Sequence, residues 1–405
     1  MKSYAHLISA GVAFVILMVG IFSFDAYAKS LEQRYINSLA KLDLSQFANG
    51  SALQLAALHQ PDLLPLYGSS EITLLKTPYE ASTFFRNYPT GFMVFDIANM
   101  GASSLTIAQA LASLGPDLKD KKVVISITPS TATMGPLGGV NADNYTGNFS
   151  LLHANELAFS PYLSFQLKKQ AASRMLTFPE TLKTDPLLHF TLSRLASDSP
   201  GDRALYFIAW PLGELQTAII RLLDHRAVVS YVLRRSLDPA VQQTPQTIDW
   251  AALQKTALAE QQQHSDSNPY GVDNSRWDQI RGLLANPLPT GSRDAAFVNS
   301  LQSATEWVDL DIELQVLDEL GAKALILSRP MNVQLWEGLG VSEHAQNFYY
   351  QKLSEVVDPY HLLLINFRQY GTDKYFSIDM ASHTSREGWI YVDQALDDFY
   401  HGRIQ

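Results

Sequence analysis

Near the two ends of this chain lie side chains of the types that carry out nucleophilic catalysis. An apolar run, Leu63–Tyr67, is followed by Gly68 and then by Ser70, so a hydroxyl stands where a strand is expected to end. Far along the chain, Asp379 and His383 lie on one short segment. A histidine can take the proton of a serine hydroxyl, and a carboxylate can orient that histidine. The residue types therefore predict a nucleophile, a base and its carboxylate, provided that the fold brings the two ends together.

Each of these residues also has an ordinary explanation. Serines after a glycine are common in turns, and Ile72 takes the place of the last glycine in a Gly-x-Ser-x-Gly elbow. A single histidine is usually a surface or core residue, and a single aspartate is usually a loop carboxylate or a helix cap. The prediction of a shared site therefore depends on the elements that position Ser70, Asp379 and His383.

Five short apolar runs, each ending in turn or polar residues, predict the strands of a parallel sheet that is buried on both faces. They are Leu63–Tyr67, Phe92–Ile97, Val123–Ile127, Ala324–Leu327 and Leu362–Ile365. Helical patterns at Leu105–Leu114 and at Leu301–Leu320, the latter closed by Gly321, separate some of these runs. This alternation predicts an α/β fold with a doubly wound, mostly parallel sheet, in which ligands bind beyond the carboxyl ends of the strands. Both halves of the site would then lie on one rim.

Helical patterns dominate between about residues 150 and 300, where the strand pattern fades. Within this block, Leu212–Leu223 has apolar residues at helical spacing and is typical of an amphipathic helix. We interpret the block as a helical insertion into one α/β domain that spans residues 61–405. On the next predicted helix, Asp309, Asp311 and Glu313 are expected to form a solvated face.

The N-terminus carries an uncharged apolar run, Leu7–Phe24. Its 18 residues would span roughly 27 Å as a helix, close to the thickness of a bilayer core. We therefore predict a membrane anchor over residues 1–28 and a helical linker over residues 29–60, with the rest of the chain outside the cytoplasm. Ala26-Tyr27-Ala28 resembles a signal-peptidase site, so cleavage after Ala28 is the alternative to a retained single-pass anchor.

Composition excludes several classes of function. The net charge of −10 argues against a nucleic-acid partner, because phosphate backbones are bound by basic surfaces. The chain has no cysteine, which excludes disulfides, thiolate metal sites and cysteine nucleophiles. The sequence also lacks a His-Glu-x-x-His motif, a P-loop and a Gly-x-Gly-x-x-Gly motif. We therefore predict an enzyme that uses no metal ion and no cofactor.

Both ends of the chain resemble one known family. The run from Leu64 to Glu71 is similar to the first block of DltD proteins, which are members of the SGNH hydrolase-like superfamily. The segment that holds Asp379, His383 and Gly388-Trp389 resembles their last block. Pro330-Met331-Asn332 resembles the Pro-x-Asn segment that follows a late strand in that family. The resemblance implies a flavodoxin-like, three-layer α/β fold for the catalytic domain.

The resemblance also implies a function. Such proteins are extracytoplasmic, membrane-anchored serine enzymes of D-alanylation, which place D-alanyl esters on teichoic acid or a related envelope polymer. The acyl group would come from a membrane-bound acyltransferase partner and its D-alanyl carrier machinery. By position, Ser70 would be the nucleophile, His383 the base and Asp379 the carboxylate. An acyl-serine would form and then pass to an acceptor hydroxyl.

Two features depart from the family's pattern. The family usually has two residues between the aspartate and the histidine, whereas Asp379 and His383 have three residues between them. Asp373 or a backbone carbonyl is therefore an alternative orienting group. The oxyanion is expected to meet the backbone N–H groups of Ser70 and Gly101. No asparagine stands at the end of the third predicted strand, so a hydroxyl or a backbone group would have to serve as a further donor.

Two other functions fit the same residues. An esterase or O-acetyl hydrolase of an envelope polysaccharide would use the same triad to pass the acyl group to water. A non-catalytic scaffold of the D-alanylation machinery would bind carrier or polymer with a degenerate site. The shifted aspartate and the absent asparagine favour the scaffold, whereas Ser70 and His383 with their flanking residues favour an enzyme.

Overall fold

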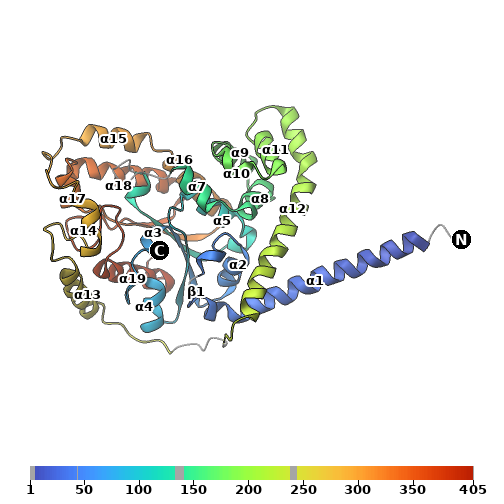
Figure 1. Ribbon diagram of the computed structural model, residues 1–405, viewed down its shortest axis with the longest axis horizontal. Helices are drawn as coiled ribbons and strands as arrows, with labels where there is room; N and C mark the ends of the chain where they lie inside the picture. The colour runs from blue at the N-terminus through green and yellow to red at the C-terminus, as the bar shows by residue number, and fades with distance from the viewer. Residues whose placement is uncertain (1–4, 43, 133–140, 238–243, 405) are drawn as a thin grey trace.

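A five-stranded parallel sheet forms the centre of the computed structural model, which describes residues 5–42, 44–132, 141–237 and 244–404 (Figure 1). The strands are β1 (Leu63–Gly68), β2 (Met93–Ala98), β3 (Lys122–Ile127), β4 (Lys323–Ser328) and β5 (Leu363–Ile365). All neighbouring pairs are parallel, in the order β2-β1-β3-β4-β5. This is the strand order of flavodoxin-like, doubly wound sheets. The five predicted strands and the predicted α/β class are confirmed.

Helices precede, connect and follow the strands. Before the sheet come α1 (Ala5–Leu39), the 3-10 turn η1 (Ser45–Phe47) and α2 (Ala52–His59). Between β1 and β3 lie α3 (Ser70–Thr73), α4 (Ala81–Asn87), α5 (Ser104–Ala112) and η2 (Gly115–Leu118). The long segment between β3 and β4 holds α6 (Pro129–Ala132), α7 (Ala142–Asn148), α8 (Leu151–Phe159), α9 (Phe165–Met175), α10 (Pro179–Leu182), α11 (Pro186–Leu195), α12 (Pro200–Leu233), α13 (Trp250–His264), α14 (Asn274–Ile280), α15 (Asp294–Gln302) and α16 (Glu306–Glu319). After β4 come α17 (Val333–Gly338), α18 (Glu343–Val357), η3 (Asp358–Tyr360), η4 (Arg368–Tyr370) and α19 (Arg386–Tyr400).

Side chains of each strand alternate between two apolar cores, because successive residues of a strand point to opposite faces. Leu66 of β1 and Val124 of β3 pack in the core that α4 and α19 cover. Tyr67 and Ile125, the next residues of the same strands, pack in the core that α5 and α16 cover. Burial on both faces explains why the strands appear in the sequence as nearly continuous apolar runs.

The predicted helix Leu301–Leu320 is in fact two helices. The helix α15 ends at Gln302, and α16 begins at Glu306. The predicted C-cap is confirmed, since Gly321 has a φ of +70°, a left-handed conformation that favours glycine.

The acidic residues of α16 do not form the predicted solvated face. Asp309 and Glu313 are buried, because α16 packs against both α5 and α9. Arg174 of α9 donates from Nε and Nη2 to the two carboxylate oxygens of Asp309, at 2.6 and 2.9 Å. Burial raises the pKa of Glu313 well above its usual value, which favours the neutral form. Asp311 accepts a hydrogen bond from the hydroxyl of Tyr360 at 2.5 Å.

The N-terminal helix α1 runs without a break across the predicted boundary between anchor and linker at residue 28. Among the described residues, one helical stretch, His6–Leu39, is long and apolar enough to span a membrane, and its most apolar window is not buried. The first half of α1 projects away from the body, whereas the second half packs against α2 and α12 (Figure 1). The predicted anchor thus coincides with a free apolar helix of suitable length.

Candidate active site

Ser70 begins the short helix α3 two residues after the end of β1. The turn before it requires glycine, because a Cβ at Gly68 would lie 2.4 Å from Oε1 of Glu71 and equally close to Ile72. The buried carboxylate of Glu71 accepts the backbone N–H of Ser69 at 2.9 Å. This tight turn leaves the side chain of Ser70 half-buried at the carboxyl end of β1.

Asp379 and His383 lie on the loop between η4 and α19. Oδ1 of Asp379 accepts the backbone N–H groups of Ala381 at 2.9 Å and of His383 at 3.4 Å. Ser382 has a φ of +61°, a left-handed conformation that is uncommon for residues other than glycine. The loop therefore turns back on its own aspartate, and this turn absorbs the extra residue between Asp379 and His383.

The histidine loop meets Ser70 across 313 residues of sequence. Nε2 of His383 lies 2.8 Å from Oγ of Ser70, and Nδ1 of His383 lies 2.7 Å from Oδ2 of Asp379. Only 13% of the His383 side chain and 9% of the Asp379 side chain are exposed, so water competes little for these contacts. With Nδ1–H donating to Asp379, Nε2 is free to accept the serine proton. The three residues, called the Ser–His–Asp cluster below, can activate a hydroxyl for attack on a carbonyl.

Asp373, the alternative orienting carboxylate, has other partners. Its Oδ1 accepts the backbone N–H of Tyr375 at 3.0 Å. Its carboxylate faces Glu387 of α19, and burial together with this neighbour raises the pKa of Glu387 to about 8. Among the described residues, Asp379 is therefore the carboxylate that contacts His383.

Gly101 lies in the turn that follows β2, the strand next to β1. Because the two strands are parallel and in register, this turn leaves the sheet on the same rim as Ser70. Gly101 has a φ of +76°, and a Cβ there would lie 2.1 Å from Nδ2 of Asn144. Asn148, also on α7, donates from its side chain to the carbonyl of Met100 at 3.1 Å. The helix α7 thus packs an asparagine amide against the glycine that the sequence predicts as an oxyanion donor.

Sequence reasoning did not find Asn144. The sequence does contain a signal that Asn144 lies in the first turn of a helix, because Asn141 and Asn144 form a capping box at the N-terminus of α7. The contact with Gly101 depends instead on the packing of α7 against the turn after β2, which no local pattern specifies.

Arg329, at the end of β4, lies between the two halves of the site. Its side chain is fully buried, and its Nε donates to Oγ1 of Thr384 in the histidine loop at 2.8 Å. Burial lowers the pKa of Arg329 to about 10, while the nearby carboxylate of Glu71, next to the serine, acts in the opposite direction. The guanidinium also lies 5.4 Å from the ring centre of Trp389. Arg329 therefore links the end of β4 to the histidine loop, and its charge lies near the carboxylate beside the serine.

A groove of about 430 Å³ lies beside α3, along the edge strand β2. Thr73 of α3 and the turn after β2 line one end, and residues just after α1 line another part. Its charged lining residues are Lys41, Lys76, Arg86, Glu80 and Asp96. Burial raises the pKa of Asp96 to about 7, which weakens its negative charge near neutral pH. The groove thus holds three cationic side chains and two carboxylates, and Lys76 lies 3.8 Å from Glu80.

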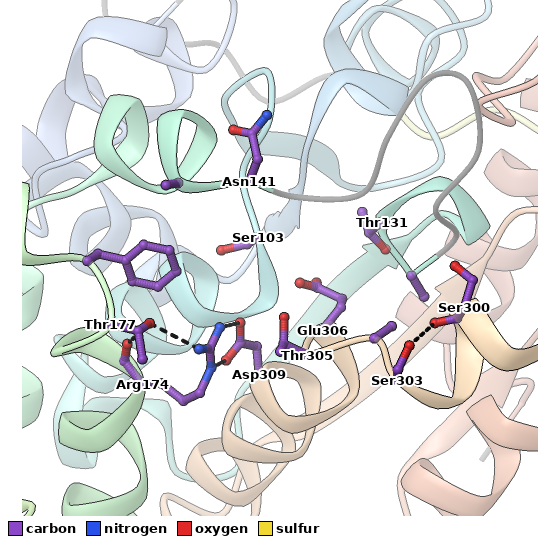
Figure 2. Close-up of a pocket in the computed structure, with 14 residues that line it drawn as sticks. Ser103, Thr131, Asn141, Arg174, Thr177, Ser300, Ser303, Thr305, Glu306 and Asp309 are labelled. Atoms are coloured by element: carbon purple, nitrogen blue, oxygen red, sulfur yellow. Dashed lines mark hydrogen bonds and ion pairs between the residues drawn. The ribbon is translucent and has the colours of Figure 1, made fainter.

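A separate cavity of about 320 Å³ lies where the N-termini of α5 and α16 approach α9 and α15 (Figure 2). Arg174 and Asp309 pair with each other at its wall. Glu306 accepts the backbone N–H of Ser104 at 3.0 Å, and burial raises the pKa of Glu306 to about 8. The described residues that line this cavity include none of the Ser–His–Asp cluster. We therefore assign the candidate active site to the rim at Ser70.

The chain is similar to known proteins over nearly its whole length. A family model described as DltD protein matches residues 43–401. Protein DltD of Bacillus subtilis (strain 168) is 25% identical over 373 residues, which cover 91% of this chain and 90% of that protein. Protein DltD of Staphylococcus aureus (strain NCTC 8325 / PS 47) is 20% identical over 406 residues, covering 100% of this chain and 97% of that protein.

Proposed function

The chain belongs to the DltD family, whose members take part in the D-alanylation of teichoic acid, and we propose that it is a serine acyltransferase within that process. One observation carries the proposal: His383 contacts both Ser70, at 2.8 Å, and Asp379, at 2.7 Å. A hydroxyl, a base and a carboxylate in this geometry can form an acyl-enzyme and release the acyl group to a second nucleophile.

The reaction has two balanced halves. The Ser70 hydroxyl attacks the D-alanyl carbonyl of the donor while its proton passes to Nε2 of His383, and the leaving group then takes that proton as its bond to the carbonyl breaks. In the second half, His383 takes the proton of a polymer hydroxyl, which attacks the acyl-serine and forms the new ester. The proton returns to Ser70 as the acyl–serine bond breaks. Asp379 stabilises the imidazolium that forms in each half.

The proposed setting is the outer face of the cell membrane. The apolar helix α1 is the retained single-pass anchor, and the α/β domain faces the envelope. The donor is a membrane-bound acyltransferase that receives D-alanine from its carrier. An anchored enzyme fits this partner, because both are confined to the same surface.

The oxyanion of each half needs donors on the Ser70 rim. We assign the backbone N–H groups of Ser70 and Gly101 to this role, together with the side-chain amide of Asn144. The contact between Asn144 and Gly101 supports the assignment. Donors of this kind act most strongly when they are fixed before the charge develops.

Asn144→Ala is expected to lower kcat by about 10²- to 10³-fold, the usual effect of removing one oxyanion donor, and to leave KM nearly unchanged. Steady-state rates of D-alanyl transfer measure both constants. Asn141→Ala is the matched control, because it disrupts the same helix cap and removes no proposed donor. Equal losses of kcat in the two variants would contradict the assignment and reduce Asn144 to a structural role.

The groove beside α3, with its three cationic side chains, favours a polyanionic acceptor. A polyol phosphate carries one negative charge in each repeat, and Lys41, Lys76 and Arg86 line this groove, which reaches Thr73 at the end of α3. Such a chain could bind by charge and present its hydroxyls to Ser70. The groove therefore supports transfer to teichoic acid over hydrolysis of a neutral ester.

The double variant Lys41→Gln/Lys76→Gln is expected to raise KM for a poly(glycerol phosphate) acceptor several-fold, with kcat unchanged, and more strongly at low salt than at high salt. The assay follows D-alanyl ester on the polymer and free D-alanine in solution. Lys255→Gln, on the exposed surface of α13, is the control. An unchanged KM would reject the groove as the acceptor site. Release of free D-alanine at the same rate with and without acceptor would instead identify an esterase.

A further inference from the structure

The long helix α12 presents an apolar face to the outside of the molecule. From Ala204 to Leu223, every residue in the exposed class is apolar. The large ones are Leu205, Phe207, Ile208, Leu212, Leu215, Ile219 and Leu223, with exposures from 41% to 75%. The predicted amphipathic pattern of this segment is present, but much of its apolar stripe faces away from the protein. We call this surface the apolar face of α12.

The opposite side of α12 carries the polar contacts of the helix. Trp210 donates from Nε1 to the carbonyl of Phe159 at 2.9 Å, and Tyr206 donates to the carbonyl of Ala158 at 3.0 Å. Asp224 accepts two backbone N–H groups at the start of α2, both at 2.9 Å. The helix is therefore held in one rotation about its axis, and the apolar face is a fixed feature of the folded protein.

The apolar face of α12 is continuous with the free part of α1. Buried His225 lies 2.8 Å from Glu32 and 3.7 Å from Asp25, so the two helices cross just beyond the C-terminal end of the face. On α1, the exposed apolar stretch ends at Phe22 and Ser23, and Phe24, next to Asp25 at the same crossing, is half-buried. Figure 1 shows the two helices diverging from this point, with α1 leaving the body and α12 running along its side. The apolar surfaces of α1 and α12 therefore meet at the point where the two helices cross.

We propose that α12 lies in the interfacial layer of the membrane that α1 anchors, with its apolar face in the lipid. The face extends over about 30 Å of helix, and its exposed residues are all apolar, as hydrocarbon requires. The polar residues of the same stretch are partly or fully buried, and the side chains of Gln216 and Arg221 pair with Asp185 and Glu156. Interfaces between separately folded proteins are only about as apolar as an ordinary surface. Exposed arginines stand at both ends, Arg203 and Arg226, where they can meet anionic headgroups.

Contact of α12 with the membrane would fix the orientation of the domain as well as strengthen its binding to the lipid. A single spanning helix leaves the attached domain free to rotate and tilt, whereas a second contact at an angle to the first fixes its orientation. The Ser70 rim would then stand at a set height and direction relative to the membrane in which the donor lies. The inference rests on α1 as an anchor and does not depend on the proposed reaction.

The absence of cysteine allows a direct test on the full-length chain. Single variants Leu212→Cys and Ile219→Cys, labelled with an environment-sensitive fluorophore, are placed in vesicles of phosphatidylcholine and phosphatidylglycerol. Lys255→Cys on the exposed surface of α13 is the aqueous control, and Leu17→Cys on α1 is the lipid control. Unchanged thermal midpoints show that the labelled chains are folded. Quenching is measured with doxyl lipids and with iodide in the buffer.

Labels on α12 are expected to respond as the Leu17 label does. Doxyl lipids should quench them, and iodide should quench the Lys255 label several-fold more strongly than the labels at positions 212 and 219. Iodide quenching of the α12 labels equal to that at Lys255 would show that the face lies in water and overturn the proposal. Protection from both quenchers would also overturn it, because a partner protein or a second copy would then cover the face. A Leu17 label insensitive to doxyl lipids would overturn it together with the anchor.

Discussion

Ser70→Ala is expected to abolish D-alanyl transfer, with a loss on the order of 10⁶-fold in kcat, as in other enzymes whose serine and histidine act as one unit. The thermal midpoint should change little, because a half-buried hydroxyl at a strand end contributes little packing. His383→Ala should reach the same residual rate. The double variant should be no worse than either single variant, since each change already removes the shared step. The measurement is transfer by membranes that contain the partner acyltransferase and charged carrier.

Ser69→Ala is the matched control for the nucleophile. Ser69 is the adjacent serine, and its side chain makes no capping bond at the start of α3. The Ser69→Ala variant should retain nearly full activity. For the proposed pair, a Ser70→Ala/His383→Ala double variant about ten times slower than either single variant would contradict a shared role for Ser70 and His383.

Asp379→Asn is expected to lower kcat by about four orders of magnitude, because an amide would favour the wrong tautomer of His383 and could not stabilise the imidazolium. The loop should survive this change. The amide oxygen can still accept the backbone N–H of Ala381, which the carboxylate accepts at 2.9 Å. Rates of D-alanyl transfer and the thermal midpoint together separate a lost function from a lost fold.

Asp373→Asn provides the comparison, since its carboxylate contacts Tyr375 and faces Glu387 rather than His383. Its activity should stay close to that of the unmodified protein. Near-normal transfer by the Asp379 variant, or a large loss in the Asp373 variant alone, would contradict the proposed role of Asp379.

The sheet could be predicted from the sequence because burial on both faces gives each strand its own apolar run. Five such runs placed their polar ends on one rim, and this was enough to expect Ser70 near His383. The spacing between Asp379 and His383 was harder to interpret. The turn at Ser382, with its left-handed φ, restores the contact, and no local sequence rule requires that conformation.

Features that depend on packing between distant elements could not be predicted. Asp309 and Glu313 are charged residues in a helical pattern, but helices on both sides bury them and Arg174 supplies a partner for Asp309. The contact of Asn144 with Gly101 likewise arises from the packing of α7. An amphipathic pattern in α12 predicts one apolar face, but it does not say whether that face meets the core or the surroundings.

The central claim is that Ser70 carries the acyl group between donor and polymer. The most direct test is to supply the full-length chain with the D-alanyl donor and its membrane partner, omit the acceptor, quench in acid and determine the mass of the peptide that holds Ser70. We predict that this peptide gains one D-alanyl group, that the group is lost when poly(glycerol phosphate) is added before the quench, and that Ser70→Ala carries none. Transfer to the polymer that proceeds with Ser70 unacylated, or with Ser70 replaced by alanine, would contradict the claim.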